Sequence, residues 1–232
     1  MKMNTRMRSG FTLVELLVVI VIIAALAGLT APMVIKQRKK ADQTEAVSNA
    51  RQIGLALFEF ETAYGSFPDA TTGDTVTQQT GTTLTFPGGT ANDYFRQLIA
   101  AEIAQAESMF YAKTSFTKKP DNVYNTTAKA LGKGEVGFGY LLNTTNAFST
   151  AGNPSRPIVA APLAYPFADG KFDPDMYDFK AVVLKIDNSV TSLQIRKTDS
   201  KVVLGTSDLI TPGEETVWGK DARPTIANPE SK

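Results

Sequence analysis

The pattern of apolar and polar residues along the chain begins with a long apolar segment. Residues 16–35 contain no charged side chain. A helix of about 20 residues rises about 30 Å, which is the thickness of the hydrocarbon core of a bilayer. The β-branched residues do not favour a strand here, because the segment is too long and too continuous for one. The pattern predicts a membrane-spanning helix and leaves one carboxylate, Glu15, unexplained at its start.

The pattern becomes amphipathic after a basic cluster at residues 36–40. Apolar residues then recur three or four positions apart, which places them on one side of a helix; they are Ala46, Ala50, Ile53, Leu57, Phe60 and Tyr64. We predict one helix over residues 11–64, with a membrane or filament-core part at about 11–35 and an amphipathic part at 36–64. Gly65 follows the last apolar position, and Pro68 prevents the helix from continuing.

Residues 65–232 predict an α+β head, in which the long helix packs on a small antiparallel β-sheet. A second helix is expected from Asn92 or Asp93 to about Ala112. Strand-like segments at 180–186, 190–197 and 201–205 predict an antiparallel meander. The pattern predicts a loop at 69–92, which a short strand at 82–86 could interrupt, an irregular stretch at 113–156, and an extended or mobile tail after Trp218.

The composition lowers the expectation of an enzyme. The 232 residues include no histidine and no cysteine, so the commonest general base, the commonest metal ligand and the thiolate nucleophile are all absent. The formal net charge is +1, which is not the basic excess of a nucleic-acid-binding protein. We predict no catalytic residue, no metal ligand, no cofactor and no nucleic-acid partner.

The N-terminal apolar segment has two interpretations on physical grounds alone. A cleaved secretory signal would be processed near residues 25–28, but the apolar region of a signal peptide has only about 7–15 residues, and this one includes Glu15. A plain membrane anchor explains the hydrophobicity. It does not explain a glutamate, which costs about 2.5–3.5 kcal/mol at the centre of a membrane helix and less near its end.

A third interpretation comes from the sequence GFTLVEL at residues 10–16. This sequence, with the apolar segment after it, resembles the processing site of type IV prepilins and type II secretion pseudopilins. The resemblance implies that residues 1–10 are a leader peptide, which a prepilin peptidase removes by cutting between Gly10 and Phe11. It also implies that Phe11 is then N-methylated. The expected location is the inner membrane, with a single span and the head on the periplasmic or extracytoplasmic side.

The resemblance implies an assembly role for Glu15. In the family, this glutamate is thought to pair with the α-ammonium group of the mature N-terminus of a neighbouring subunit. The physics agrees, because a buried carboxylate is tolerated when a cation pairs with it, and such a pair can fix the register between apolar helices. A local alternative remains: Glu15 lies in the first helical turn, where free N–H groups and the helix dipole stabilise a carboxylate of the same chain.

The apolar segment contains a helix-disturbing pair, Gly28 and Pro32. A proline inside a helix removes one hydrogen bond and clashes with the preceding turn. We predict a kink or local unwinding between these residues, and a proline near this position is common in pilins.

A second resemblance lies at the end of the long helix. Phe60, Gly65, Phe67 and Pro68 are spaced as in the major pseudopilin of type II secretion, with phenylalanine where that family often has tyrosine. The absence of cysteine favours the same group, since many type IV pilins close a C-terminal disulfide loop. The remaining residues form a longer head than that of a typical major pseudopilin.

Two further patterns predict turns and no binding site. GKGEVG at residues 132–137 fits G-x-G-x-x-G but lacks the flanking strand and helix of a dinucleotide-binding loop. The acidic segment at 169–178 contains Asp169, Asp173, Asp175 and Asp178, but its spacing fits no EF-hand loop and Pro174 interrupts it.

The sequence as a whole predicts a structural subunit of a type IV-pilus-like helical filament, most directly a type II secretion pseudopilin that drives protein export. The partners implied by the resemblance are the prepilin peptidase/methyltransferase, copies of the same chain, minor pilins or pseudopilins, and an inner-membrane assembly platform. A type IV pilus subunit for adhesion, motility or DNA uptake is the alternative within this class. A membrane-anchored binding or enzymatic head is the alternative outside it.

Overall fold

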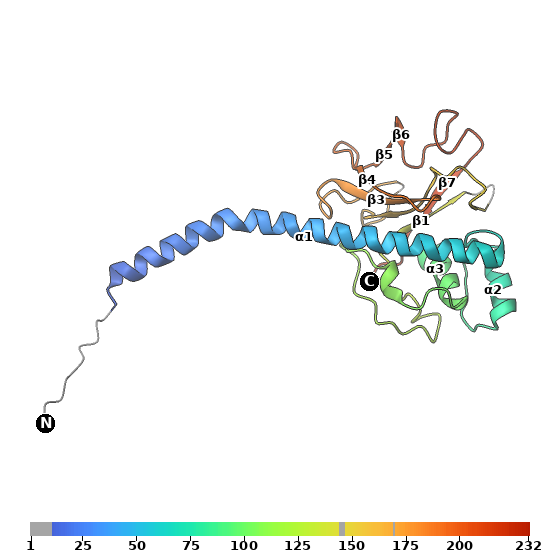
Figure 1. Cartoon of the computed structure of the whole chain (residues 1–232), viewed down its shortest axis with the longest axis horizontal. Helices are drawn as coiled ribbons and strands as arrows, with labels where there is room; N and C mark the ends of the chain where they lie inside the picture. The colour runs from blue at the N-terminus through green and yellow to red at the C-terminus, as the bar shows by residue number, and fades with distance from the viewer. Residues whose placement is uncertain (1–10, 144–146, 169) are drawn as a thin grey trace, which may run out of the picture. The chain divides into compact units, whose positions relative to one another are not determined.

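The computed structural model describes residues 11–143, 147–168 and 170–232 (Figure 1). It separates into two compact units, residues 1–38 and residues 39–232. One helix, α1 (Leu13–Tyr64), has its first half in the former unit and its second half in the latter. The leader predicted for residues 1–10 lies outside the described residues.

The second half of α1 forms part of the core of the head. The residues buried along it include five of the six predicted apolar positions, with Gly54 and Ala56 beside them: Ala46, Ala50, Ile53, Gly54, Ala56, Leu57 and Phe60. The sixth, Tyr64, is partly buried against the core and stacks on Phe60, with ring centroids 4.4 Å apart. The helix ends where predicted, because Gly65 adopts a left-handed φ of 85°.

The head contains one antiparallel sheet of five strands in the order β4-β3-β2-β1-β7. The strands are β1 (Gly139–Asn143), β2 (Pro157–Ala161), β3 (Lys180–Lys185), β4 (Val190–Gln194) and β7 (Pro224–Ala227). The central strand β2 is buried along its whole length, since other parts of the head cover both faces of the sheet. Figure 1 shows the sheet on one side of α1 and the helices α2 and α3 on the other.

Long-range contacts hold α1 in this position. Gln43 Nε2 donates to the Ser192 hydroxyl in β4 (2.8 Å). On the opposite side, Asn49 Nδ2 donates to the carbonyl of Tyr111 (2.8 Å). Close to the C-terminus of the helix, Glu61 Oε1 accepts a hydrogen bond from the backbone N–H of Thr150 (2.8 Å). The long helix and antiparallel sheet confirm the predicted fold class, an α+β, pilin-like arrangement.

Two helical predictions need correction. The expected loop at 69–92 contains the helix α2 (Thr72–Thr80) and no strand at 82–86. Its threonine-rich sequence has a weak helix propensity, but Asp69 Oδ1 accepts hydrogen bonds from the N–H groups of Thr71 and Thr72 and so caps the helix start. The helix predicted to reach residue 112 is α3 (Ala91–Ala100), which is followed by the short 3-10 helix η1 (Glu107–Phe110).

The early end of α3 has a local cause. Glu102 adopts a left-handed φ of 59°, and the N–H groups of Ile103 and Ala104 both turn back to the carbonyl of Leu98. The helix begins at the cap residue Thr90, which forms a capping box with Asp93. The prediction extended the helix because apolar spacing continues to Phe110, and that spacing does not show where the backbone reverses.

The predicted meander is only partly correct. The hairpin of β3 and β4 forms as expected, but the third segment supplies β5 (Val203–Leu204), which pairs with β6 (Ser207–Asp208) in a separate two-stranded sheet. The stretch predicted as irregular contains β1. The tail after Trp218 is extended, as predicted, and its strand β7 pairs with β1 at the edge of the main sheet, so it does not lie free of the head.

Candidate assembly site

The N-terminus of α1 places Thr12 and Glu15 in a reciprocal capping arrangement. Glu15 Oε2 accepts hydrogen bonds from the backbone N–H of Thr12 (2.8 Å) and from its hydroxyl (2.7 Å). The N–H of Glu15 donates to the Thr12 hydroxyl oxygen (3.2 Å). This is a capping box, which satisfies N–H groups that the first helical turn leaves free. The local role considered for Glu15 is therefore present in the single chain.

The capping box leaves part of the Glu15 carboxylate available. Among the described residues, its second oxygen, Oε1, accepts no hydrogen bond, and no cationic side chain forms an ion pair with Glu15. Phe11, the residue implied as the mature N-terminus, is 81 % exposed. Glu15, predicted for assembly, and Phe11, predicted for processing, are thus both exposed at the start of the helix.

The apolar part of α1 exposes all of its large side chains. Every residue from 11 to 38 is exposed, and an 18-residue window of α1 has a mean hydropathy of 2.8 with none of it buried. By length and composition this helix can cross a membrane. Apolar surface of this extent requires either lipid or other apolar helices around it.

Gly28 and Pro32 lie within an unbroken helix. The helix runs continuously through both residues, so the local unwinding predicted for this segment is not observed in the single chain. Pro32 has no N–H to donate to the carbonyl of Gly28, one turn earlier. The Thr30 hydroxyl donates to the carbonyl of Leu26 (3.0 Å), which occupies a neighbouring acceptor. A kink at this position stays a prediction, as does the assembly role of Glu15.

The patterns that were predicted to be turns are explained by packing. Gly134 adopts a φ of 78° beside Lys232, and a side chain on Gly137 would overlap the backbone of Ala112. In the acidic segment, Asp173 Oδ1 accepts a hydrogen bond from the N–H of Asp175 (2.9 Å), a local turn. Asp169 lies outside the described residues.

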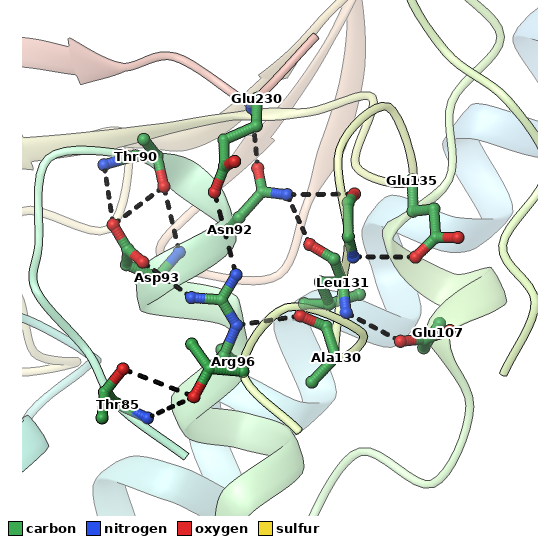
Figure 2. A network of polar contacts seen from close by, with 12 residues as sticks. Thr85, Thr90, Asn92, Asp93, Arg96, Glu107, Ala130, Leu131, Glu135 and Glu230 are labelled. Atoms are coloured by element: carbon green, nitrogen blue, oxygen red, sulfur yellow. Dashed lines mark hydrogen bonds and ion pairs between the residues drawn. The ribbon is translucent and has the colours of Figure 1, made fainter. Parts of the chain in front are cut away.

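The head contains a buried polar network that the sequence analysis did not predict (Figure 2). Arg96 is 3 % exposed. It pairs with Asp93 (2.7 Å) and donates to the carbonyl of Ala130 (2.8 Å). Asn92 Nδ2 donates to the carbonyl of Leu131 (2.7 Å), and its Oδ1 accepts from the N–H of Glu230 in the C-terminal tail (2.9 Å). Helix α3 thereby fixes both the 130–132 loop and the tail.

The same loop binds two buried carboxylates. The N–H of Leu131 donates to Glu107 Oε1, and the N–H of Gly132 donates to Glu135 Oε2, both at 2.7 Å. Burial raises the pKa of Glu107; the Leu131 hydrogen bond lowers it, and the nearby Glu135 carboxylate raises it further. The one indication of these buried carboxylates in the sequence is Glu107, which lies among small and apolar residues in AQAESMF at residues 104–110.

Comparison with known proteins identifies the class of the N-terminus. The family model described as the prokaryotic N-terminal methylation motif matches residues 5–31. With the long helix and the antiparallel sheet, this match gives the chain a type IV pilin-like N-terminus on a pilin-like α+β fold.

More specific matches are to pseudopilins. The chain is 41 % identical over 66 residues to the type II secretion system core protein G of Aeromonas hydrophila. The aligned residues make up 28 % of this chain and 46 % of that protein. It is 35 % identical over 71 residues to the type II secretion system core protein G of Pseudomonas aeruginosa. This alignment covers 31 % of this chain and 50 % of that protein. The chain spans about half the length of these curated relatives. No solved structure matches. The resemblance to type II secretion pseudopilins predicted from the sequence is thus confirmed.

Proposed function

We propose that the protein is a structural subunit of a type IV-pilus-like filament, a type II secretion pseudopilin whose polymerisation drives protein export. The observation that carries this proposal is an exposed apolar helix that begins with a carboxylate and matches the methylation motif. The similarity to core protein G favours a pseudopilus over a surface pilus. The function needs no active site, and we propose no catalytic residue.

The helix suits two environments in turn. Before assembly, lipid would surround residues 11–35 in the inner membrane. After assembly, the same side chains would pack against the helices of neighbouring subunits. Dispersion and close packing stabilise such contacts, because lipid tails are as apolar as the helices. Such packing does not by itself select one axial register.

Glu15 supplies the register in this proposal. After cleavage between Gly10 and Phe11, Phe11 carries an α-ammonium group, which stays cationic after a single methylation. A neighbouring subunit's ammonium group would pair with the oxygen of Glu15 that the capping box leaves free. A paired carboxylate is tolerated in an apolar environment, whereas an unpaired one is expelled or neutralised. Only the correct offset between two helices pairs both groups.

The proposed partners follow from this cycle. A prepilin peptidase and methyltransferase would process the chain at the membrane. Copies of the chain, minor pseudopilins and an inner-membrane assembly platform would then build the filament, with the head outside the cytoplasm.

Cysteine cross-linking tests the proposal against a background that contains no native cysteine. Leu17→Cys places one thiol in the exposed apolar segment. We expect oxidation of cells that carry the secretion machinery to give covalent dimers of this variant, and we expect Glu15→Gln in the same chain to abolish them. A monomeric membrane anchor would give no dimers in either background. Dimers that persist with Glu15→Gln would contradict the register role.

A further inference from the structure

One end of the head is formed jointly by α1 and by the β3–β4 hairpin. The turn of this hairpin lies against α1 at Gly54, where an added side chain would overlap Asn188. Further along β4, Ser192 accepts a hydrogen bond from Gln43. Strand β4 therefore runs toward the N-terminus of α1 (Figure 1). The residues that follow β4 lie at the end of the head where α1 enters it, directly after the apolar segment.

Four lysines from three separate segments gather at this end of the head. Lys180 pairs in register with Gln194, two residues beyond Ser192. Two residues of strand and four residues of helix both cover about 6–7 Å, so Lys180 lies at about the level of Lys39 on α1. The four lysines are Lys39 and Lys40 on α1, Lys180 at the start of β3, and Lys197 just after β4.

These four lysines have no carboxylate partner. None of them forms an ion pair within the part of the chain that the structure describes, although Asp42 and Asp178 are near them in the sequence. Three of them are exposed and Lys39 is half-exposed. Other lysines of the head do pair with carboxylates, as Lys201 does with Asp208. This end of the head therefore presents positive charge that the chain itself does not neutralise.

Phe179 adds an aromatic ring that is held in a strained conformation. It adopts a left-handed φ of 61°, directly after Asp178 with a φ of 54°, and such values are rare and unfavourable for a bulky residue. Hydrogen bonds to Pro174 and from Ile195, both 2.8 Å, hold this backbone in place. The ring is only partly buried, and Lys197 Nζ lies 4.8 Å from its centre. Aromatic rings beside lysines are typical of the membrane–water interface.

We propose that this end of the head docks on the surface of the membrane, where its lysines bind the anionic headgroups of phospholipids. We call the surface of Lys39, Lys40, Phe179, Lys180 and Lys197 the docking end. Lipid phosphates supply the negative charge that the chain lacks there, and each lysine near an anionic surface strengthens binding about fivefold. The position also fits, because the apolar segment ends at residue 35, four residues before Lys39.

Docking adds a step to the proposed function. It would hold the head against the bilayer before assembly, and it would be broken when the subunit enters a filament. The inference rests on the membrane span in the proposed function and does not depend on filament assembly.

Thiol labelling of the full chain in lipid vesicles tests the docking end. Thr198→Cys places a thiol beside Lys197, and Gln78→Cys places one in α2, at the other end of the head (Figure 1). The reagent is an uncharged polyethylene glycol maleimide, which surface charge does not attract and which a docked surface excludes. The vesicles contain either phosphatidylcholine alone or equal parts of phosphatidylcholine and phosphatidylglycerol. We expect phosphatidylglycerol to slow labelling of the Thr198→Cys chain at least about fivefold at low salt, and high salt to restore it. Labelling of the Gln78→Cys chain should not change.

Charge-removing variants show which lysines act. Lys180→Gln combined with Lys197→Gln should abolish the protection of the Thr198→Cys chain. The matched control, Lys129→Gln combined with Lys133→Gln, removes the same charge from exposed positions elsewhere on the head and should leave the protection intact. Glu15→Gln should also leave it intact, which separates a failure of docking from a failure of filament assembly.

Equal labelling in the two kinds of vesicle, by a chain that resists alkaline extraction, would overturn the proposal. So would protection that persists in high salt or in the Lys180 and Lys197 double variant, or protection that is lost in the control double variant. Protection that rises with the ratio of protein to lipid would indicate a second copy of the chain as the partner, and would also overturn it. A chain that alkaline extraction removes from the vesicles would contradict both the membrane span and the docking.

Discussion

Glu15 Oε2 lies 2.7 Å from the hydroxyl of Thr12 and accepts hydrogen bonds from both the hydroxyl and the N–H of that residue. One carboxylate therefore caps its own helix at the start of an exposed apolar segment. The capping role and the proposed assembly role use different properties of the side chain. The first needs an acceptor oxygen, and the second needs a negative charge.

Two substitutions separate these properties. Glu15→Gln keeps an acceptor, since glutamine also serves in a capping box, but removes the charge. Thr12→Ala removes the cap, at a cost of about 0.5–2 kcal/mol to the helix, and keeps the charge. Each substitution is added to the Leu17→Cys chain. We expect the cross-linked dimers to form when Thr12→Ala is added and to be lost when Glu15→Gln is added, while both double variants stay in the membrane. Loss of the dimers with Thr12→Ala together with their retention in Glu15→Gln would show that the cap, and not the charge, matters.

The glycine at position 137 should be among the least replaceable in the head. Its N–H donates to the carbonyl of Phe110 (3.0 Å), and an added methyl group would overlap the backbone of Ala112. We expect Gly137→Ala to lower the free energy of unfolding by about 1–3 kcal/mol or more, since backbone cannot move aside as a side chain does. Thermal unfolding of the purified chain in detergent measures this change.

Gly73→Ala in α2 is the matched control for that measurement. There the added methyl group lies 3.3 Å from Cβ and Cδ2 of Phe86, a contact that a shift of a few tenths of an ångström relieves, and alanine favours the helix by about 0.5–1 kcal/mol. A similar loss of stability in both variants would contradict the explanation by close backbone approach.

Two arginines with the same spacing to an aspartate should differ in their effect on stability. Arg96 pairs with Asp93 in the interior, while Arg196 pairs with Asp199 at the surface. Arg96→Ala should cost about 3–5 kcal/mol, because it leaves a buried carboxylate unpaired. Arg196→Ala should cost much less, because water replaces an exposed partner. Chemical denaturation of both variants makes the comparison, and equal effects would contradict it.

Asp199 should contribute to stability only above strongly acidic pH. Hydrogen bonds from Arg196, at 2.9 and 2.6 Å, lower the pKa of Asp199 to about 2. A carboxylate with a lower pKa in the folded than in the unfolded chain stabilises the fold above its unfolded pKa, near about 3.9, and loses that effect as the pH falls to its folded pKa. The Tm gap between wild type and Asp199→Asn should therefore be full at about pH 5, shrink as the pH falls, and close only below about pH 2. A gap that does not change with pH would contradict this account.

The sequence predicted α1 well, because its information is local. Spacings of three and four positions define the buried side from Ala46 to Phe60, and Gly65 marks the end. The β3–β4 hairpin was predictable for the same reason, since its turn residues lie between two apolar runs. By contrast, β7 pairs with β1 across about eighty residues, and nothing in its own four residues identifies that partner.

The buried network of the head was not predictable from spacing. Glu107 and Glu135 lie far apart along the chain, and no local pattern indicates that both bind the same loop. They meet because Asn92 and Arg96 hold the 130–132 loop against α3. By contrast, the Glu15 motif is a contiguous sequence, so a resemblance alone could identify it.

The mass of the mature N-terminal peptide tests the central claim most directly. Purified from cells that contain the processing enzyme, the chain should begin at Phe11 and carry one methyl group on its α-nitrogen. A chain that retains Met1, or one that begins near Gly28 as a cleaved secretory protein would, contradicts the account.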